Sequence, residues 1–508
     1  MKVLFTGLYP LWHYHFVSEL NLLETHATSG DTVWLATCDA NLSNCECNRR
    51  HDLSHCLRCI GIRQHGLLLA DTKVKTVSLI HPKYAKATPK KIPLQFVSLE
   101  ELKKFEFEGF DLGMAVFSSL VDRLSNTNPD VTTHRKIVRS LVLDAWRVWM
   151  SAKEILARQQ FDKIYIFNGR YAAARPWVRA CQQSGVAFTT HEKSGNVEKI
   201  LLFDDQFPHD PTQYAARVES FWAKHGHKES VRSEGVEFFE ERPRGQLTGW
   251  ISFVTAQQEG RLPSSWEPGR RNIAVFATTD GEYVGLRDLY ADGLYPDQSA
   301  AFLDVAEQVY QRDNSIFFYI RLHPNSLNEA VRWWESPRFR EAPNLEIIPP
   351  DSRVSSYALM AASEKCITFL SSAGIEATYW GKPSLILGKA FYSGINAVYE
   401  PSTSEEAYAW VVGCPENKPQ DNAIKFGAFM RSGGVNLPYS EPLNYYTLKF
   451  KGEVLEASTP VREWLGECEK RKSVSGLKKW LQDRNDKKRF NQMIKDFEGA
   501  LSDTSQSG

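Results

Sequence analysis

One stretch, from Lys365 to Lys389, constrains the fold of this chain more than any other. Ile367–Leu370 is a short apolar run of residues that favour strands, and the Ser371-Ser372 pair after it opens a helical pattern. The helical pattern ends at a Gly-Lys-Pro tripeptide, and a second buried strand is expected at Leu385–Leu387. Strand, tight turn, helix and strand in this order predict a parallel β-α-β unit and therefore an α/β fold.

The turn inside this unit is a candidate phosphate site. Backbone N–H groups and two hydroxyls would converge there at the start of a helix, so Ser371, Ser372 and Gly374 are candidate ligands of a nucleotide. As an alternative, Ser372 does no more than cap the helix. Glu376 comes four residues after Ser372, whereas a capping box requires three. We therefore expect its carboxylate near the same crevice, where it would accept hydrogen bonds from ribose hydroxyls.

Length and charge bound the class of protein. The 508 residues are 42% hydrophobic, which is enough for two domains of ordinary size. We expect domains at 1–250 and 251–450, followed by a helical tail at 451–508. Lysine plus arginine (61) balances aspartate plus glutamate (61), so the chain lacks the basic field of a nucleic-acid binder. No apolar run is long enough to span a membrane and no signal peptide is recognisable, so we expect a cytoplasmic protein that makes at most peripheral contact with the inner face of the membrane.

The N-terminal residues predict another β-α-β unit. Lys2–Phe5 and Thr32–Ala36 read as strands, and Phe16–His26 reads as the helix between them. The expected loop after the first strand carries His13 and His15, at the sheet edge where open α/β folds bind ligands. Either imidazole is a candidate acid/base group, and the alternative is that this aromatic loop only packs the rim of the domain.

Two more strands are expected in the first half, at Lys163–Phe167 and Val186–Thr190. Glu192 follows the second of them, in a loop at the same edge as the first strand's loop. We take Glu192 as the preferred general base of this half. The alternative is an exposed loop acid without a role.

A second β-α-β series follows an expected interdomain connection at 233–269. Its strands are predicted at Ile273–Ala277, Ser315–Leu322 and Leu345–Ile348, ahead of the unit described first. Strand alternation places Arg321 and His323 on one face at the carboxyl end of their strand. A cation and an imidazole beside Ser371 and Ser372 would complete a phosphate pocket.

The cysteines are unevenly distributed, because five of nine fall between Cys38 and Cys59. They form a C-x-C and a C-x-x-C pattern with two histidines between them, and the set is Cys38, Cys45, Cys47, Cys56, Cys59, His51 and His55. Such spacing suits a metal clip, so we predict a structural zinc in a cysteine-rich insertion at 38–60 of the first domain. An iron–sulfur cluster and unligated thiols are the alternatives.

Three motifs of the second half resemble those of a known family. Asp280-Gly281, His323-Pro324 and Ser371-Ser372 are similar to the acidic-Gly, HP and SS motifs of bacterial sialyl- and polysialyltransferases and related capsule polysaccharide enzymes. These are two-Rossmann (GT-B) glycosyltransferases. The chain departs from their pattern because it lacks paired acids before the glycine and adds the cysteine segment.

This resemblance implies two doubly wound Rossmann-like domains that face a cleft. In that family the HP and SS motifs hold the nucleotide phosphate of the donor, while an acidic group on the other domain serves as the base. The resemblance extends well over the second half of the chain and only loosely over the first half.

We therefore expect a glycosyltransferase of surface or capsular polysaccharide biosynthesis. Its donor would be a nucleotide sugar, with a CMP-linked sugar as the specific candidate, and its acceptor a glycan or lipid-linked glycan. Whether the transfer is of the hexosyl, sialyl or Kdo type stays open at this point. Glu192 would act as the base, with His13, His15 and Asp280 as alternatives, and no catalytic divalent metal is expected.

Two other functions remain open from the sequence. A sugar-nucleotide epimerase could use the same scaffold and phosphate pocket, because a fold does not fix a function. A zinc-stabilised, non-catalytic binding protein is the third candidate.

Overall fold

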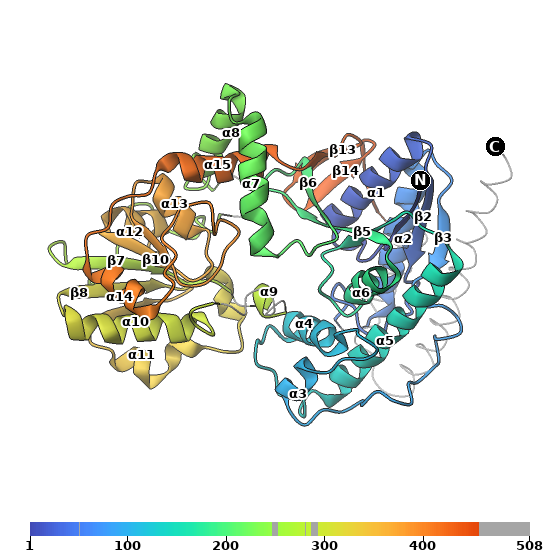
Figure 1. Cartoon of the computed structure of the whole chain (residues 1–508), viewed down its shortest axis with the longest axis horizontal. Coiled ribbons are helices and arrows are strands. Elements are labelled where there is room, and N and C mark those ends of the chain that lie inside the picture. The colour runs from blue at the N-terminus through green and yellow to red at the C-terminus, as the bar shows by residue number, and fades with distance from the viewer. Residues whose placement is uncertain (50, 246–251, 280, 286–292, 457–508) are drawn as a thin grey trace.

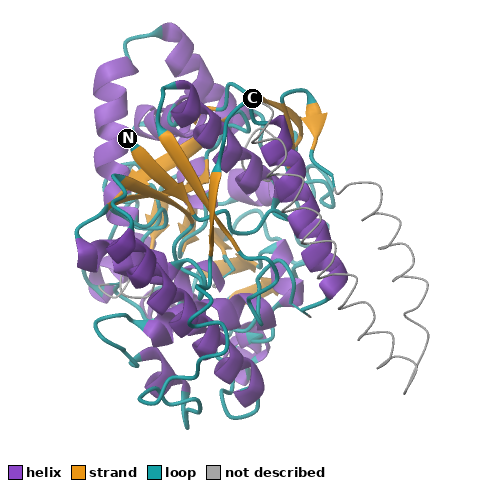
Figure 2. Cartoon of the chain, turned by 90° about the vertical axis from the view of Figure 1, so that its right-hand side faces the viewer, coloured by secondary structure: helices purple, strands orange, loops and turns teal. Residues whose placement is uncertain are grey.

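The computed structural model describes residues 1–49, 51–245, 252–279, 281–285 and 293–456. Two largely parallel sheets, each with helices on both faces, make the chain a two-part α/β protein (Figure 1). The doubly wound, Rossmann-like fold class expected from the sequence is confirmed. Figure 2 shows the strands enclosed between layers of helices.

The first sheet has seven strands in the order β12-β6-β5-β4-β1-β2-β3. Its strands are β1 Lys2–Phe5, β2 Thr32–Thr37, β3 Lys75–Ser78, β4 Lys163–Phe167, β5 Ala187–Lys193, β6 Lys199–Asp204 and β12 Val435–Asn436. Neighbouring strands are parallel throughout the series β5, β4, β1, β2 and β3. Strand β6 pairs antiparallel with β5, and β12 pairs antiparallel with β6. Successive residues of β1 point to opposite faces, so Val3 packs on one core and Leu4 on the other.

Helices cover both faces of this sheet. Residues of α1 and α2 share a core with Val3, and residues of α4, α5 and α6 share a core with Leu4. The helices of this part are α1 His13–Thr28, α2 Leu53–Leu69, α3 Leu99–Lys103, α4 Leu112–Leu124, α5 Arg135–Arg158 and α6 Arg175–Ser184. The crossover helices thus lie on either side, as a doubly wound sheet requires.

The second sheet has five parallel strands in the order β11-β10-β7-β8-β9. They are β7 Arg271–Phe276, β8 Ile316–Arg321, β9 Leu345–Ile348, β10 Lys365–Thr368 and β11 Ser384–Ile386. The accompanying elements are α9 Gly281–Val284, α10 Gln298–Arg312, η2 Pro324–Asn328, η3 Trp333–Glu335, α11 Pro337–Glu341, α12 Ser356–Ala362, α13 Ala373–Tyr379 and α14 Ser404–Val412. Residues of α10 and α14 pack on one face and residues of α12 and α13 on the other.

A helical layer joins the two parts. It consists of α7 Pro211–His225, α8 Glu229–Glu240 and α15 Gln420–Ser432, which pack together with α13. The backbones of α8 and α15 approach closely where two glycines meet, since a Cβ on Gly427 would lie 2.6 Å from the carbonyl oxygen of Gly235. The interdomain connection expected at 233–269 therefore begins in a helix, and a larger side chain at Gly427 would separate the pair.

After α15 the chain returns to the first sheet. Strand β12 pairs with β6, and a small sheet of β13 Ser440–Asn444, β14 Thr447–Phe450 and β15 Glu453–Val454 follows. Leu448 and Phe450 are fully buried against α1. Residues 435–455 thus lie with the first sheet, although 435–450 fall in the range expected for the second domain. The expected helical tail falls almost wholly on 457–508, outside the described residues.

The opening β-α-β prediction is confirmed as β10, α13 and β11, but two expected loops are wrong. Helix α1 already begins at His13, so the histidines stand in its first turn. Strand β5 runs on through Lys193 because β6 pairs with it along that length, so Glu192 lies in a strand. No helix among the described residues is long and apolar enough to cross a membrane.

The predicted cysteine-rich insertion is not confirmed. Cys56 and Cys59 lie on α2, the crossover helix between β2 and β3, and Cys38 follows the end of β2. Cys45 and Cys47 pack partly buried against the core of the first sheet. The part of the segment that lies on α2 therefore belongs to the regular winding of the fold.

Candidate active site

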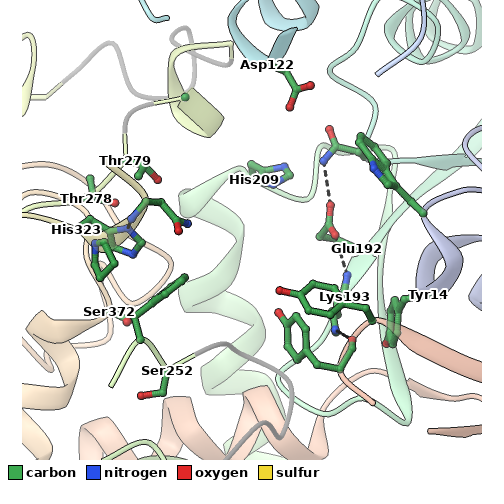
Figure 3. Close-up of a pocket in the computed structure, with 18 of the residues that line it drawn as sticks. Tyr14, Asp122, Glu192, Lys193, His209, Ser252, Thr278, Thr279, His323 and Ser372 are labelled. Atoms are coloured by element: carbon green, nitrogen blue, oxygen red, sulfur yellow. Dashed lines mark hydrogen bonds between the residues drawn. The ribbon is translucent and has the colours of Figure 1, made fainter. Parts of the chain in front are cut away.

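The carboxyl ends of both sheets face one cavity of about 1350 Å³. Figure 3 shows the side chains that line it in two groups opposite each other. One group comes from the second part of the chain and includes Thr278, His323 and Ser372, and the other comes from the first part and includes Glu192 and Lys193. A cavity between two such strand edges is where α/β proteins place their ligands.

Strand register explains the second-part group. Phe276 of β7 stands level with Arg321 of β8 and with Thr368 of β10. His323 and Ser371 follow those positions by two and three residues, so they emerge at the same edge. The HP and SS motifs therefore line the same cavity, at the same edge of the second sheet.

His323 is a hydrogen-bond donor to the cavity in its neutral form. Its Nδ1 accepts the backbone N–H of Asn325 at 3.1 Å, and its ring packs edge-on against Phe253 with centroids 4.7 Å apart. Burial, assisted by Arg321, lowers the pKa of His323 to about 4. Because Nδ1 accepts, the proton of the neutral ring belongs on Nε2, where it is available to a ligand oxygen.

Arg321 is committed to the protein. It is only 3% exposed, its Nη1 donates to the carbonyl oxygen of Pro349, and its Nη2 donates to that of Ser352 at 3.0 Å. Burial lowers its pKa to about 10. Arg321 thus fixes the turn after β9, and a direct phosphate contact by this residue stays a prediction.

Ser371 and Ser372 differ in the hydrogen bonds that their hydroxyl groups make. Ser371 Oγ accepts the backbone N–H of Ala373 at 3.3 Å, whereas Ser372 Oγ both donates to Glu376 at 2.9 Å and accepts from Arg242 at 3.1 Å. Gly374 is required by packing, because a Cβ there would lie 2.4 Å from the hydroxyl oxygen of Tyr392. Among the described residues no acceptor is found for the hydroxyl proton of Ser371, which can therefore be donated into the cavity.

Glu376 lies at the centre of a buried ionic network. Arg242 Nη2 lies 2.9 Å from Glu376 Oε1, Tyr357 donates its hydroxyl to Oε2, and the two charged residues are 7% and 5% exposed. Burial acts to raise the pKa of Glu376, but Arg242 and the hydrogen bonds outweigh it and the pKa lies below its usual value. Both carboxylate oxygens are thus already occupied, and the ribose contact stays a prediction.

Glu192 faces the cavity from β5. Its Oε2 accepts from Asn168 Nδ2 at 2.9 Å, its Oε1 accepts the backbone N–H of Lys193 at 3.0 Å, and His15 Nε2 lies 3.7 Å from Oε1. Asn168, at the end of β4, adopts a left-handed backbone with φ of 59°, which its short amide side chain tolerates. The carboxylate is therefore oriented, yet it remains on the cavity wall.

The other proposed bases differ in position. The ring of His15 packs on Phe167, with centroids 4.1 Å apart, and burial lowers its pKa well below the usual value, so it is neutral beside Glu192. His13 lines the same cavity, and burial followed by Arg58 lowers its pKa as well. Asp280 lies outside the described residues, although its neighbours Thr279 and Gly281 line the cavity.

Sequence reasoning missed Lys193 and its tyrosine partners. Lys193 Nζ lies 3.0 Å from the ring centroid of Tyr445 and 4.4 Å from that of Tyr14, and it donates to the carbonyl oxygen of Tyr445. Burial lowers the pKa of Lys193 to about 7, against the attraction of Glu192. Nothing near Tyr445 in the sequence signals this contact, because the two residues are 252 positions apart.

The five cysteines do not form a recognisable metal site. Within the described parts of the chain, no group of three or more His, Cys, Asp or Glu side chains is arranged to hold a metal ion. Burial raises the pKa of Cys38 to about 12 and that of Cys56 to about 11, and raises those of Cys47 and Cys59 well above the usual value. The zinc prediction is therefore not supported.

Comparisons with known proteins find distant structural similarity only. No family model matches the chain, and no curated protein does. A β-Kdo 2,4-transferase, KpsC of Thermosulfurimonas dismutans, is 11% identical over 60% of this chain and 87% of its own, with a TM-score of 0.35. The UDP-GlcNAc 2-epimerase of Neisseria meningitidis is 10% identical over 86% of this chain and 96% of its own, with a TM-score of 0.25. The calicheamicin glycosyltransferase CalG4 is 12% identical over 85% of this chain and 95% of its own, with a TM-score of 0.26. These similarities are remote and show the fold alone.

Proposed function

We propose that this protein is a glycosyltransferase that uses a nucleotide-sugar donor. The observation that carries the proposal is the single cavity between two strand edges, with hydrogen-bond donors on one side and an oriented carboxylate on the other. Sugar transfer requires both at once, because a phosphate leaves as an acceptor hydroxyl loses its proton.

The second-part wall is suited to the leaving nucleotide. When the bond between the anomeric carbon and the phosphate oxygen breaks, its electron pair stays on the phosphate. The Nε2–H of His323 and the hydroxyl of Ser371 would donate to that oxygen as its charge grows. Donors held in place before the reaction stabilise such a charge without reorganisation.

The first-part wall would supply the base. Glu192 would take the proton of the acceptor hydroxyl while the hydroxyl oxygen forms the new bond to the anomeric carbon. Asn168 and the backbone of Lys193 hold the carboxylate in one orientation, which suits a group that must meet a defined hydroxyl. His15 lies 3.7 Å away and would keep the carboxylate in place.

The finer assignment rests on the motif resemblance. The acidic-Gly, HP and SS motifs support a CMP-linked donor and a glycan or lipid-linked glycan acceptor of surface or capsular polysaccharide assembly. A structural zinc ion is not part of this proposal, because the described cysteines and histidines form no metal-binding group.

A sugar-nucleotide epimerase is the second candidate function. The same cavity brings a carboxylate and neutral histidines opposite the phosphate-binding wall, and proton transfer at a sugar ring carbon needs such groups.

One experiment separates the two functions. The protein is incubated with CMP-, UDP-, GDP- and dTDP-sugars, with and without a mixture of bacterial oligosaccharides, and the products are separated by chromatography. A transferase releases nucleotide fast only when oligosaccharide is present. An epimerase converts the nucleotide sugar without any acceptor, and that result would replace our proposal. No turnover of any donor under either condition would refute both functions.

A further inference from the structure

The tip of the β13–β14 hairpin reaches the acceptor side of the cavity. Tyr445 and Tyr446 form the turn of this hairpin, and both line the cavity opposite His323. The base of the hairpin is fixed, because Leu448 and Phe450 are fully buried against α1. A segment close to the end of the described chain therefore contributes to a wall built mainly by the first 210 residues.

Lys193 fastens the hairpin tip to the sheet. Its ammonium group lies between the rings of Tyr14 and Tyr445 and donates to the carbonyl oxygen of Tyr445. Tyr14 is itself held, since its hydroxyl donates to the carbonyl oxygen of Lys199 at 2.5 Å. The ammonium group therefore makes its contacts within the protein, and the surface that it holds in place is aromatic.

Tyr446 is the exposed member of this surface. Its side chain is 64% exposed, and its ring stands nearly perpendicular to that of Tyr445, at 84° with centroids 4.8 Å apart. The backbone N–H of Tyr446 donates to Asn444 Oδ1 at 2.9 Å, which fixes the turn. A rigid turn thus presents an uncovered tyrosine ring at a cavity wall.

This arrangement suits the flat face of a sugar. The C–H groups on one face of a pyranose ring pack on an aromatic ring, and the tyrosine hydroxyl can bond the sugar's own hydroxyls. Glu192 precedes Lys193 in β5 and lines the same cavity, so the hairpin tip and the expected base belong to one wall.

We propose that Tyr445 and Tyr446 form the acceptor subsite and bind a pyranose ring of the glycan through its face. This inference rests on the proposed glycosyltransferase function and specifies how its acceptor is recognised. The cation beneath the tyrosines is enclosed, so recognition here depends on ring stacking and not on a charged group of the acceptor.

The test uses Tyr446 variants and a microarray of immobilised neutral and acidic bacterial oligosaccharides. The fluorescently labelled full-length protein is compared with Tyr446→Ala, Tyr446→Trp and the control Tyr310→Ala. Tyr310 is a tyrosine of α10 that is 39% exposed and does not line the cavity. Nucleotide binding is measured in parallel, by the shift in melting temperature with CMP, UDP, GDP and dTDP.

We expect Tyr446→Ala to lose about 10-fold in affinity for the bound oligosaccharides while its nucleotide shift is unchanged. Tyr446→Trp and Tyr310→Ala should bind like the unchanged protein. If Tyr446→Ala binds the oligosaccharides as tightly as the unchanged protein, or if the unchanged protein binds none, the subsite is overturned. A nucleotide shift in the same experiment would show that the proposed function is not refuted with it. Absence of any nucleotide shift in the unchanged protein would instead refute the proposed function and the subsite with it.

Discussion

The two walls of the cavity are assembled in different ways. The motif residues of the second-part wall stand in turns that directly follow their strands, such as His323 after β8 and Ser371 after β10. The first-part wall combines a helix start, a strand and a distant hairpin, represented by His15, Glu192 and Tyr446. The comparison teaches that local sequence can specify turns that share a sheet edge, whereas the wall proposed to bind the acceptor exists only after the chain has folded.

The largest expected effect comes from removing the base of the first-part wall, which should change sugar transfer without changing nucleotide binding. Glu192→Gln keeps the shape of the side chain and removes its basicity, so we expect sugar transfer to fall by about 10³-fold with nucleotide binding unchanged. Steady-state kinetics and calorimetric titration of the nucleotide measure the two quantities. Glu198→Gln, an exposed acid of the same part, is the matched control. Normal transfer by Glu192→Gln would remove this residue from the base role.

The next effect tests whether the second-part wall depends on a buried ion pair. Glu376→Ala leaves the Arg242 cation buried without its carboxylate, and we expect the free energy of unfolding to fall by about 3 kcal/mol. The control is Glu405→Ala, which breaks an exposed pair with Arg312 and should cost below about 1 kcal/mol. Denaturant titration measures both. Equal, small losses would show that the Glu376 network does not hold this wall together.

A smaller effect should come from the phosphate side itself. His323→Asn keeps an acceptor for the backbone N–H of Asn325 and removes the Nε2–H donor, so turnover should fall by about 10²-fold at an unchanged denaturation midpoint. The double change Ser371→Ala/Ser372→Ala should lower turnover similarly, with some loss of stability because Ser372 bonds Glu376. Unchanged turnover in both variants would show that the phosphate does not bind at these residues.

The smallest effect concerns pH and the first-part wall. Burial lowers the pKa of Lys193 from 10.5 to about 7. Between these values the unfolded chain binds this proton more tightly than the folded chain, so the contribution of Lys193 to the free energy of unfolding rises with pH. We expect Lys193→Met to remove that rise, which should amount to below about 1 kcal/mol per pH unit. Denaturant titrations from pH 7 to 10 measure the slope, and equal slopes in both proteins would contradict the expectation.

The features predicted correctly from the sequence are those encoded locally. Strands β10 and β11 with α13 between them follow from apolar runs and turn residues, and parallel pairing then brings His323 and Ser371 to one edge. Glu192 follows an apolar run that was correctly predicted to be a strand, although pairing with β6 carries this strand further than the run indicates.

The features that were missed depend on long-range contacts. Arg242 meets Ser372 across 130 positions and Lys193 meets Tyr445 across 252, and no local pattern signals either contact. The cysteine spacing likewise did not indicate its structural setting. The C-x-x-C pair that resembles a metal clip is part of the regular helix α2, and the described residues contain no recognisable metal-binding group.

The central claim is that a nucleotide phosphate binds at His323 and Ser371. The most direct test is isothermal titration calorimetry of CMP, UDP, GDP and dTDP into the unchanged protein and into His323→Asn. We predict that at least one nucleotide binds the unchanged protein and that its affinity falls by about 10-fold or more in the variant, because a charge-assisted hydrogen bond is lost. Binding of equal strength to both proteins, or no binding of any of the four nucleotides, would contradict the account.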